Sequence, residues 1–130
     1  MVLVNQEIPD SLQKDISEPK LTNQLLDLNQ TSMDLYAKSS KSVTRMPSRD
    51  QLACTVSGTQ QIAVVSAWEH KSMRINQEFP EGGYLPSQFS PVDLFSDAFR
   101  DAKVHIVALQ PGDCMYIPSH WWYQTLSAPD

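Results

Sequence analysis

The chain has 130 residues, 41% hydrophobic and 19% charged, which is enough for one domain with a substantial core. Its net charge of −5, with Lys and Arg scattered along the chain, disfavours a nucleic-acid partner. No apolar run is long enough to span a membrane, and the N-terminus does not read as a signal peptide. A cytoplasmic, reducing location without membrane insertion is therefore expected.

Residues 1–30 are predicted to form a helical or irregular lead-in, because they hold only short apolar pieces between polar stretches. The pattern then changes, since Met33, Leu35 and Ala37 alternate with polar neighbours as in a strand with one buried face. We therefore expect a β domain over residues 31–130.

Residues 51–68 predict a β-hairpin. Leu52, Cys54 and Val56 share one face of its first strand, and Ser-Gly-Thr at 57–59 supplies a turn. The returning strand, IAVVSAW, is apolar on both faces and is expected to be central and covered.

The two cysteines, Cys54 and Cys114, are sixty residues apart and match no zinc-site spacing. A disulfide is possible if they face each other. The favoured expectation is two small buried thiols.

A long loop is predicted over 69–91, where Pro and Gly interrupt a polar stretch. The segment SPVDLFSDAFRDAK then predicts a short helix with Leu94, Phe95 and Phe99 on its inner side. Two strands joined by a Pro-Gly-Asp turn follow, and WWYQTL forms another. This order suits an antiparallel β-sandwich or jelly roll.

Four features together resemble a known family: QLACTVSGTQQIAVV, the acidic SPVDLFSDAF, the turn LQPGDCMYIP, and the WW pair after it. In this order they are similar to the JmjC-like and cupin-like 2-oxoglutarate oxygenases, which hydroxylate or demethylate proteins. The resemblance covers about residues 31–126. It implies a mainly β, cupin-like double-stranded β-helix (a jelly roll) with short flanking helices.

In that family a His-x-Asp or His-x-Glu pair and a distant His hold Fe(II), and a Lys binds 2-oxoglutarate. The resemblance places Arg45 and Pro47 at the first pair and Gln60 at the lysine. The distant His position falls on Tyr123 or Gln124, with Gln124 the preferred match.

These residues depart from the family pattern in every case. Arg45 stays protonated and would place a cation where the metal belongs, and Pro47 has no donor atom in its side chain. Gln124 offers a neutral amide, a weak ligand for iron, and Gln60 lacks the charge that would hold a dianion. The sequence therefore predicts neither a metal nor a cofactor, and favours a pseudoenzyme in which Gln124 hydrogen-bonds within a polar interior.

Two alternatives stay open. A protein hydroxylase using Fe(II) and 2-oxoglutarate could have a displaced site at His120 and His105 with Asp113 or Asp50, although the chain contains no His-x-Asp or His-x-Glu. A metal-free small-molecule binder could use Arg45 to clamp a carboxylate. If Arg45 points into the sandwich, it should meet an acidic partner or water.

The three tryptophans, Trp68, Trp121 and Trp122, are expected to fill the core, with a ligand pocket or an interface as the alternative. Because the chain stops soon after the Trp strand, the resemblance implies an incomplete barrel with open strand edges. We therefore expect a protein-interaction or scaffold subunit of a larger assembly, in which partner subunits cover those edges.

Overall fold

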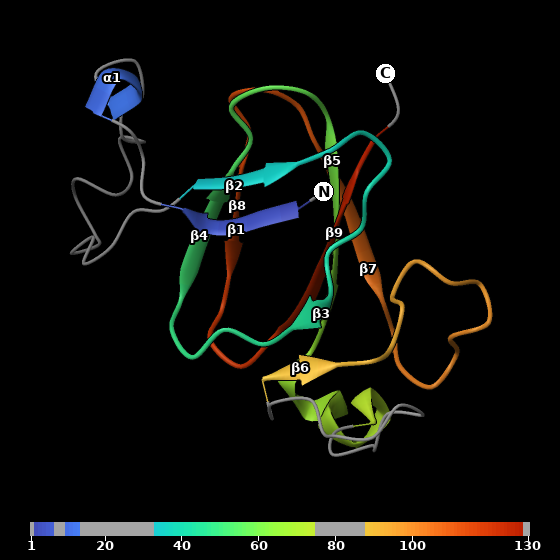
Figure 1. The fold of residues 1–130 in the computed structure, drawn as a ribbon. Coiled ribbons are helices and arrows are strands. Elements are labelled where there is room, and N and C mark those ends of the chain that lie inside the picture. Colours follow the sequence, from blue (N-terminus) through green and yellow to red (C-terminus); the bar gives the residue numbers. More distant parts are fainter. Residues whose placement is uncertain (1, 7–9, 14–32, 75–87, 129–130) are drawn as a thin grey trace, which may run out of the picture. The chain divides into compact units, whose positions relative to one another are not determined.

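The computed structural model describes residues 2–6, 10–13, 33–74 and 88–128 (Figure 1). The chain forms two compact units, residues 1–37 and 38–130, which are described separately. Within the described ranges, no helix is both long enough and apolar enough to cross a membrane.

The first unit contains a two-stranded antiparallel sheet. Strand β1 (Val2–Gln6) pairs with β2 (Met33–Tyr36), and a single helical turn, α1 (Asp10–Gln13), lies between them in sequence. The strand predicted around Met33 is confirmed, but its predicted buried face is wrong, because Leu35 and Ala37 are exposed. The strand β1 differs from the predicted helical or irregular lead-in, because the run VLV is rich in β-branched residues that favour extended backbone. The lead-in at 14–30 lies outside the described residues.

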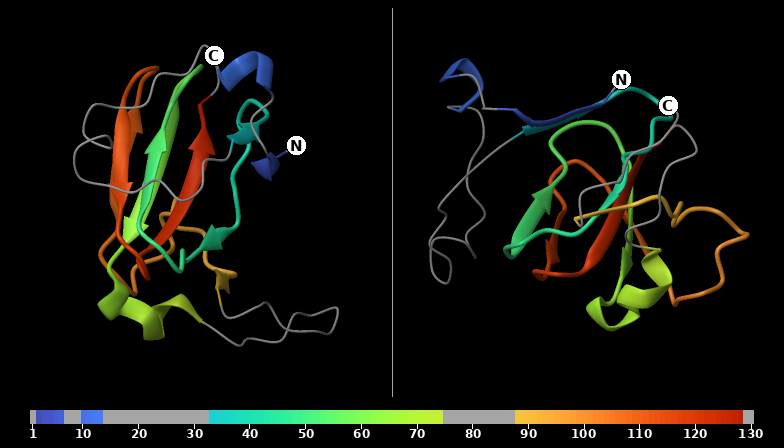
Figure 2. Two further views of the ribbon diagram at one scale, coloured as in Figure 1. Left: turned by 90° about the vertical axis from the view of Figure 1, so that its left-hand side faces the viewer. Right: turned by 60° about the horizontal axis from the view of Figure 1, so that its bottom comes forward.

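The second unit is built on a five-stranded antiparallel sheet with the order β6-β3-β9-β5-β7. Its strands are β3 (Thr44–Arg45), β5 (Gln60–Val65), β6 (Phe89–Ser90), β7 (His105–Leu109) and β9 (Trp122–Ser127). Figure 2 shows β7, β5 and β9 side by side. Strand β5 is central, as predicted.

A second sheet, β4 (Gln51–Cys54) paired with β8 (Cys114–Ile117), packs against one face of the large sheet. The cluster between the two sheets combines residues from both: Ile62, Val64, Leu109, Ile117 and Tyr123, with Ala53, Met115 and Trp121 at its margin. Two antiparallel sheets around a shared core confirm the predicted mainly β, jelly-roll architecture.

The other face of the large sheet is also covered. A 3₁₀ helix, η1 (Ala67–Met73), and the segment 91–104 pack over it. The buried residues of this outer cluster are Ala63, Val65, Met73, Val92, Leu94 and Trp122. Because both faces of β5 meet apolar layers, its sequence shows no polar alternation. The predicted 69–91 loop is thus regular at both ends, in η1 and in β6, and 75–87 lie outside the described residues.

The predicted 51–68 hairpin is wrong. Strands β4 and β5 do not pair with each other, because β4 pairs with β8 while β5 lies between β9 and β7. Residues 55–59 connect the two sheets instead of closing a hairpin. The buried side of this segment carries Ala53 and Thr55, whereas Cys54 and Val56 are exposed. A turn sequence between two strands specifies a reversal but not the partner of either strand.

The favoured expectation of two buried free thiols is also wrong. Cys54 and Cys114 are directly opposite each other in β4 and β8, with Cα atoms 4.0 Å apart, and form a disulfide. Both residues are exposed. The sequence separation of 60 residues hid this contact, since it arises only from the pairing of β4 with β8.

The short helix predicted over 90–103 is replaced by consecutive turns. Asp93 Oδ1 accepts a hydrogen bond from Phe95 N at 3.1 Å, and Ser96 Oγ accepts one from Ala98 N at 3.3 Å. Such local side-chain bonds compete with helical backbone bonds. The predicted inward side is nevertheless confirmed, because Leu94 is buried and Phe95 and Phe99 pack against the outer cluster.

Candidate functional site

Arg45 ends β3 on the inner face of the large sheet. It is directly opposite Tyr123 of β9, and cross-strand partners project to the same side. The guanidinium carbon of Arg45 lies 5.0 Å from the centre of the Tyr123 ring, within range for a cation–π contact. Tyr123 is 5% exposed and belongs to the inner cluster. The expectation of an acidic partner or water for Arg45 thus overlooked an aromatic one.

Pro47 is buried two residues further along, where its backbone rather than its side chain makes the polar contact. Its carbonyl oxygen accepts a hydrogen bond from His120 N at 2.9 Å. His120 is exposed and has a positive φ of 66°. The bond to Pro47 therefore holds the corner before β9 against the segment after β3.

Gln60 begins β5 and is half-buried. It lies on the same face as Ile62 and Val64, and Val64 is the β5 partner of Tyr123. Four residues of extended strand separate Gln60 from that level, a distance of about 13 Å. Gln60 thus lies on the same inner face as Arg45 and Tyr123, but at the opposite end of the sheet.

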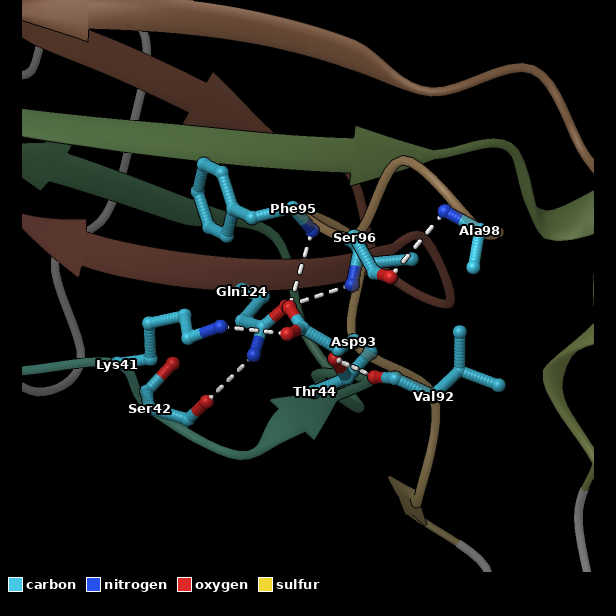
Figure 3. Close-up of polar contacts among 10 residues, drawn as sticks. Lys41, Ser42, Thr44, Val92, Asp93, Phe95, Ser96, Ala98 and Gln124 are labelled. Atoms are coloured by element: carbon cyan, nitrogen blue, oxygen red, sulfur yellow. Dashed lines mark hydrogen bonds and ion pairs between the residues drawn. The ribbon is translucent and has the colours of Figure 1, made fainter. Parts of the chain in front are cut away.

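Gln124 points the other way, because it follows Tyr123 in β9 and successive strand residues alternate between faces. Its side chain is buried and joins two segments far apart in sequence (Figure 3). Oε1 accepts a hydrogen bond from Leu94 N at 2.7 Å, and Nε2 donates one to Ser42 O at 2.9 Å. The predicted role of Gln124 as an internal hydrogen-bonding residue is confirmed. The cross-strand partner of Arg45 is Tyr123, and the preference for Gln124 over Tyr123 at the family's distant His position stays a prediction.

Further buried polar groups continue this network along β9 and β3. Ser42 Oγ accepts from Thr125 N at 2.9 Å, and Thr44 Oγ1 donates to Val92 O at 2.6 Å. Near the surface, Lys41 forms an ion pair with Asp93 (Figure 3). An open, mostly apolar hollow of about 320 Å³ lies beside the network; its lining is Val43, Thr44, Ser90, Pro91, Val92, Asp93 and Gln124.

Asp50 and the corner at 116–120 form a small exposed cluster. Asp50 Oδ1 accepts a hydrogen bond from Ser119 N at 2.7 Å, and this bond lowers the pKa of Asp50, with a second contribution from the Tyr116 hydroxyl. The same hydrogen bond to Asp50 raises the pKa of Tyr116. The cluster orients the turn before β9.

The alternative metal site finds no support. Across the described ranges, no three His, Cys, Asp or Glu side chains gather closely enough to hold a metal ion. His105 is exposed on β7, as expected, while Asp113 accepts a hydrogen bond from Gln110 N within its own turn. The predicted displaced set of His120, His105 and Asp113 or Asp50 is therefore not assembled.

The residues that the sequence resemblance places at the family's metal positions also do not fit Fe(II). Arg45 is a permanent cation, Pro47 has no side-chain donor, and the Tyr123 ring lies beneath the Arg45 guanidinium. Fe(II) in such sites takes imidazole and carboxylate ligands. No reaction step through iron can be derived from this set.

The tryptophans divide between core and surface. Trp122 is fully buried in the outer cluster, with its ring centre 5.8 Å from that of His70, and Trp121 packs at the margin of the inner cluster. The core-filling expectation is wrong for Trp68, which is 95% exposed. Its position in η1, after the end of β5, removes it from the alternation that buries Val65.

The sequence did not predict that Tyr123 contacts Arg45. The sequence does not show which residues of β9 point to the inner face of the sheet and which point to the outer face. Because both faces of the large sheet are covered, Trp122 and Tyr123 both read as core, and alternation cannot tell inner from outer. Knowledge of which β9 residue lies opposite Arg45 would have identified Tyr123 as its partner.

The two packed antiparallel sheets and the inner-face positions at the ends of β3 and β9 define a jelly-roll protein of the cupin class. The family model described as the cupin-like domain matches residues 4–128. The chain therefore belongs to the cupin-like, JmjC-like family. A comparison with curated proteins found no match.

Proposed function

We propose that this cupin-like domain is non-catalytic and serves as a protein-interaction or scaffold subunit of a larger assembly. The observation that supports this most strongly is the contact between Arg45 and Tyr123, two residues that the sequence resemblance matches to metal positions of the family. A guanidinium at that place repels a divalent cation, and the contact with Tyr123 holds it there. A rigid β-sandwich without such chemistry can still present loops and edges to partners.

The first experiment is metal analysis of the purified chain, followed by titration with Fe(II) in the absence of oxygen, with and without 2-oxoglutarate. We expect no iron at micromolar concentrations and no shift in melting temperature on adding 2-oxoglutarate. One iron per chain, stabilised by 2-oxoglutarate, would show that the domain is a hydroxylase with ligands other than those considered above.

The variant Arg45→Ala distinguishes the scaffold function from the alternative of a metal-free carboxylate binder. Arg49→Ala is the control, because Arg49 is exposed. The scaffold proposal predicts that neither variant changes binding of 2-oxoglutarate or related dicarboxylates, measured by calorimetry, since the parent chain binds none. Binding by the parent chain that is lost only in Arg45→Ala would favour the ligand-binding function instead.

A further inference from the structure

The two edges of the large sheet are protected to different degrees. The edge strand β6 has only two residues and is followed at once by Pro91, which cannot donate a ladder hydrogen bond. The other edge strand, β7, has five residues and, among the described strands, pairs only with β5. Short length and proline are common ways to block an edge, and β7 uses neither.

The sequence of β7, HIVAL, is suited to pairing on its open side. Its register with β5 runs from Val64–His105 to Gln60–Leu109 without a bulge, so the strand is regular. Ile106 is 52% exposed and Val107 is 39% exposed, on opposite faces of the sheet. An edge that no described strand pairs with, and that carries apolar side chains on both faces, favours addition of another strand.

The charges beside β7 favour an antiparallel copy of the same strand. Arg100 and Lys103 are exposed before the strand, and Asp113 is exposed in the turn after it. Of the two carboxylates nearest before the strand, Asp101 is paired with Arg74 at 3.6 Å, and the exposed Asp97 lies further from the strand than Arg100 and Lys103. One end of β7 is therefore positive and the other negative. Two antiparallel copies place each positive end beside the negative end of its partner.

We propose that two copies of this chain associate through β7, which pairs antiparallel with β7 of the second copy about a twofold axis. With all five residues paired, Val107 faces its own counterpart, and Ile106 faces Ala108 of the second copy. Each inner face then continues into the inner face of the other copy, and Lys103 lies next to the partner's 111–113 turn.

This inference deepens the proposed scaffold function and rests on it, since it names the partner that covers one sheet edge. A five-residue strand pair buries less surface than the roughly 1,200–2,000 Å² of a standard stable interface. The dimer is therefore expected to dissociate on dilution into the micromolar range.

The test is sedimentation equilibrium of the full chain, from low to several hundred micromolar, with Val107→Lys as the disrupting variant. Val107→Lys brings two ammonium groups face to face across the axis and should leave a monomer throughout. The matched control, Val56→Lys, changes a 68% exposed valine outside β7 and should dimerise like the parent chain. If Val107→Lys loses its folded circular dichroism spectrum, Ile106→Lys replaces it at a more exposed position.

A second measurement tests the register directly. Val107→Cys should form an intermolecular disulfide under mild oxidation, because residues directly opposite in antiparallel strands bring their Cβ atoms within about 5 Å. Val56→Cys should not. A monomeric parent chain at the highest concentration, or equal cross-linking of both variants, overturns the inference. Neither result affects the proposed function, which fails if iron and 2-oxoglutarate bind or if a dicarboxylate binds through Arg45.

Discussion

Arg45 and Tyr123 form a cation–π contact on the inner face of the large sheet. Arg45 is half-buried, and an aromatic ring facing a guanidinium offsets part of the cost of removing the charge from water. Tyrosine keeps the size needed to fill the inner cluster. The pair therefore contributes packing at the margin of the inner cluster.

Gln124 makes the sharpest prediction at the residue scale. Gln124→Leu keeps the volume but leaves Leu94 N and Ser42 O without the partners they have now. Each buried unsatisfied group costs about 1–3 kcal/mol, so the free energy of unfolding should fall by roughly 2–5 kcal/mol. Urea denaturation followed by tryptophan fluorescence measures this change.

The control for this substitution is Gln88→Leu, at an exposed glutamine. It should change stability by no more than about 0.5 kcal/mol. Equal effects of the two substitutions would mean that the Gln124 hydrogen bonds do not hold the 91–104 segment in place.

Asp50 makes a prediction about pH. Its hydrogen bonds from Ser119 N and Tyr116 lower its pKa in the folded chain, so the carboxylate stabilises the fold above the ordinary aspartate pKa. This contribution is lost as the pH falls through the lower, folded value. A carboxyl-carbon NMR titration should place the Asp50 midpoint below 3.8.

The variant Asp50→Asn should melt at a slightly lower temperature than the parent at neutral pH, and the difference should vanish in acid. Asp97→Asn, at an exposed position, serves as the control. An Asp50 midpoint at or above the ordinary value would contradict the hydrogen-bonded geometry of the 116–120 corner.

At the scale of elements, the Cys54–Cys114 disulfide joins the only two described strands of the second sheet. It closes a loop of about sixty residues, for which chain entropy gives a stabilisation of about 4 kcal/mol. Cys54→Ser with Cys114→Ser should lower the free energy of unfolding by about this amount. Denaturation of the parent with dithiothreitol should approach the same value.

Dithiothreitol should not change the stability of the double serine variant, which serves as the control. If the purified parent chain, prepared without reductant, reacts with two equivalents of a thiol reagent before denaturation, the disulfide is not the native form. The outcome also bears on location, because stable disulfides are typical of oxidising compartments and free thiols of the reducing cytoplasm expected from the sequence.

The segment 91–104 is a second case where an element differs from its pattern. Its apolar spacing predicts a helix, and its apolar residues are indeed buried. Ser and Asp side chains bond to nearby backbone groups and produce turns instead. The apolar spacing therefore predicted which residues face the core, but not that their backbone forms turns instead of a helix.

At the scale of the whole unit 38–130, stability comes from a central sheet covered on both faces. The inner cluster joins the two sheets, and the outer cluster joins the large sheet to η1 and the 91–104 segment. Such an architecture leaves the sheet edges, not its faces, as the places for association. The unequal protection of β6 and β7 is the reason to look for a partner at β7.

The sequence by itself determined the fold class, most strands, the burial of β5 and which side-chain donors Arg45, Pro47 and Gln60 carry. These follow from local patterns: alternation, turn residues and side-chain donors. Only the tertiary structure decided that β4 pairs with β8, that Cys54 meets Cys114, and that Tyr123 rather than Gln124 faces Arg45. Strand pairing is non-local, and a strand with both faces covered carries no signal of which side points inward.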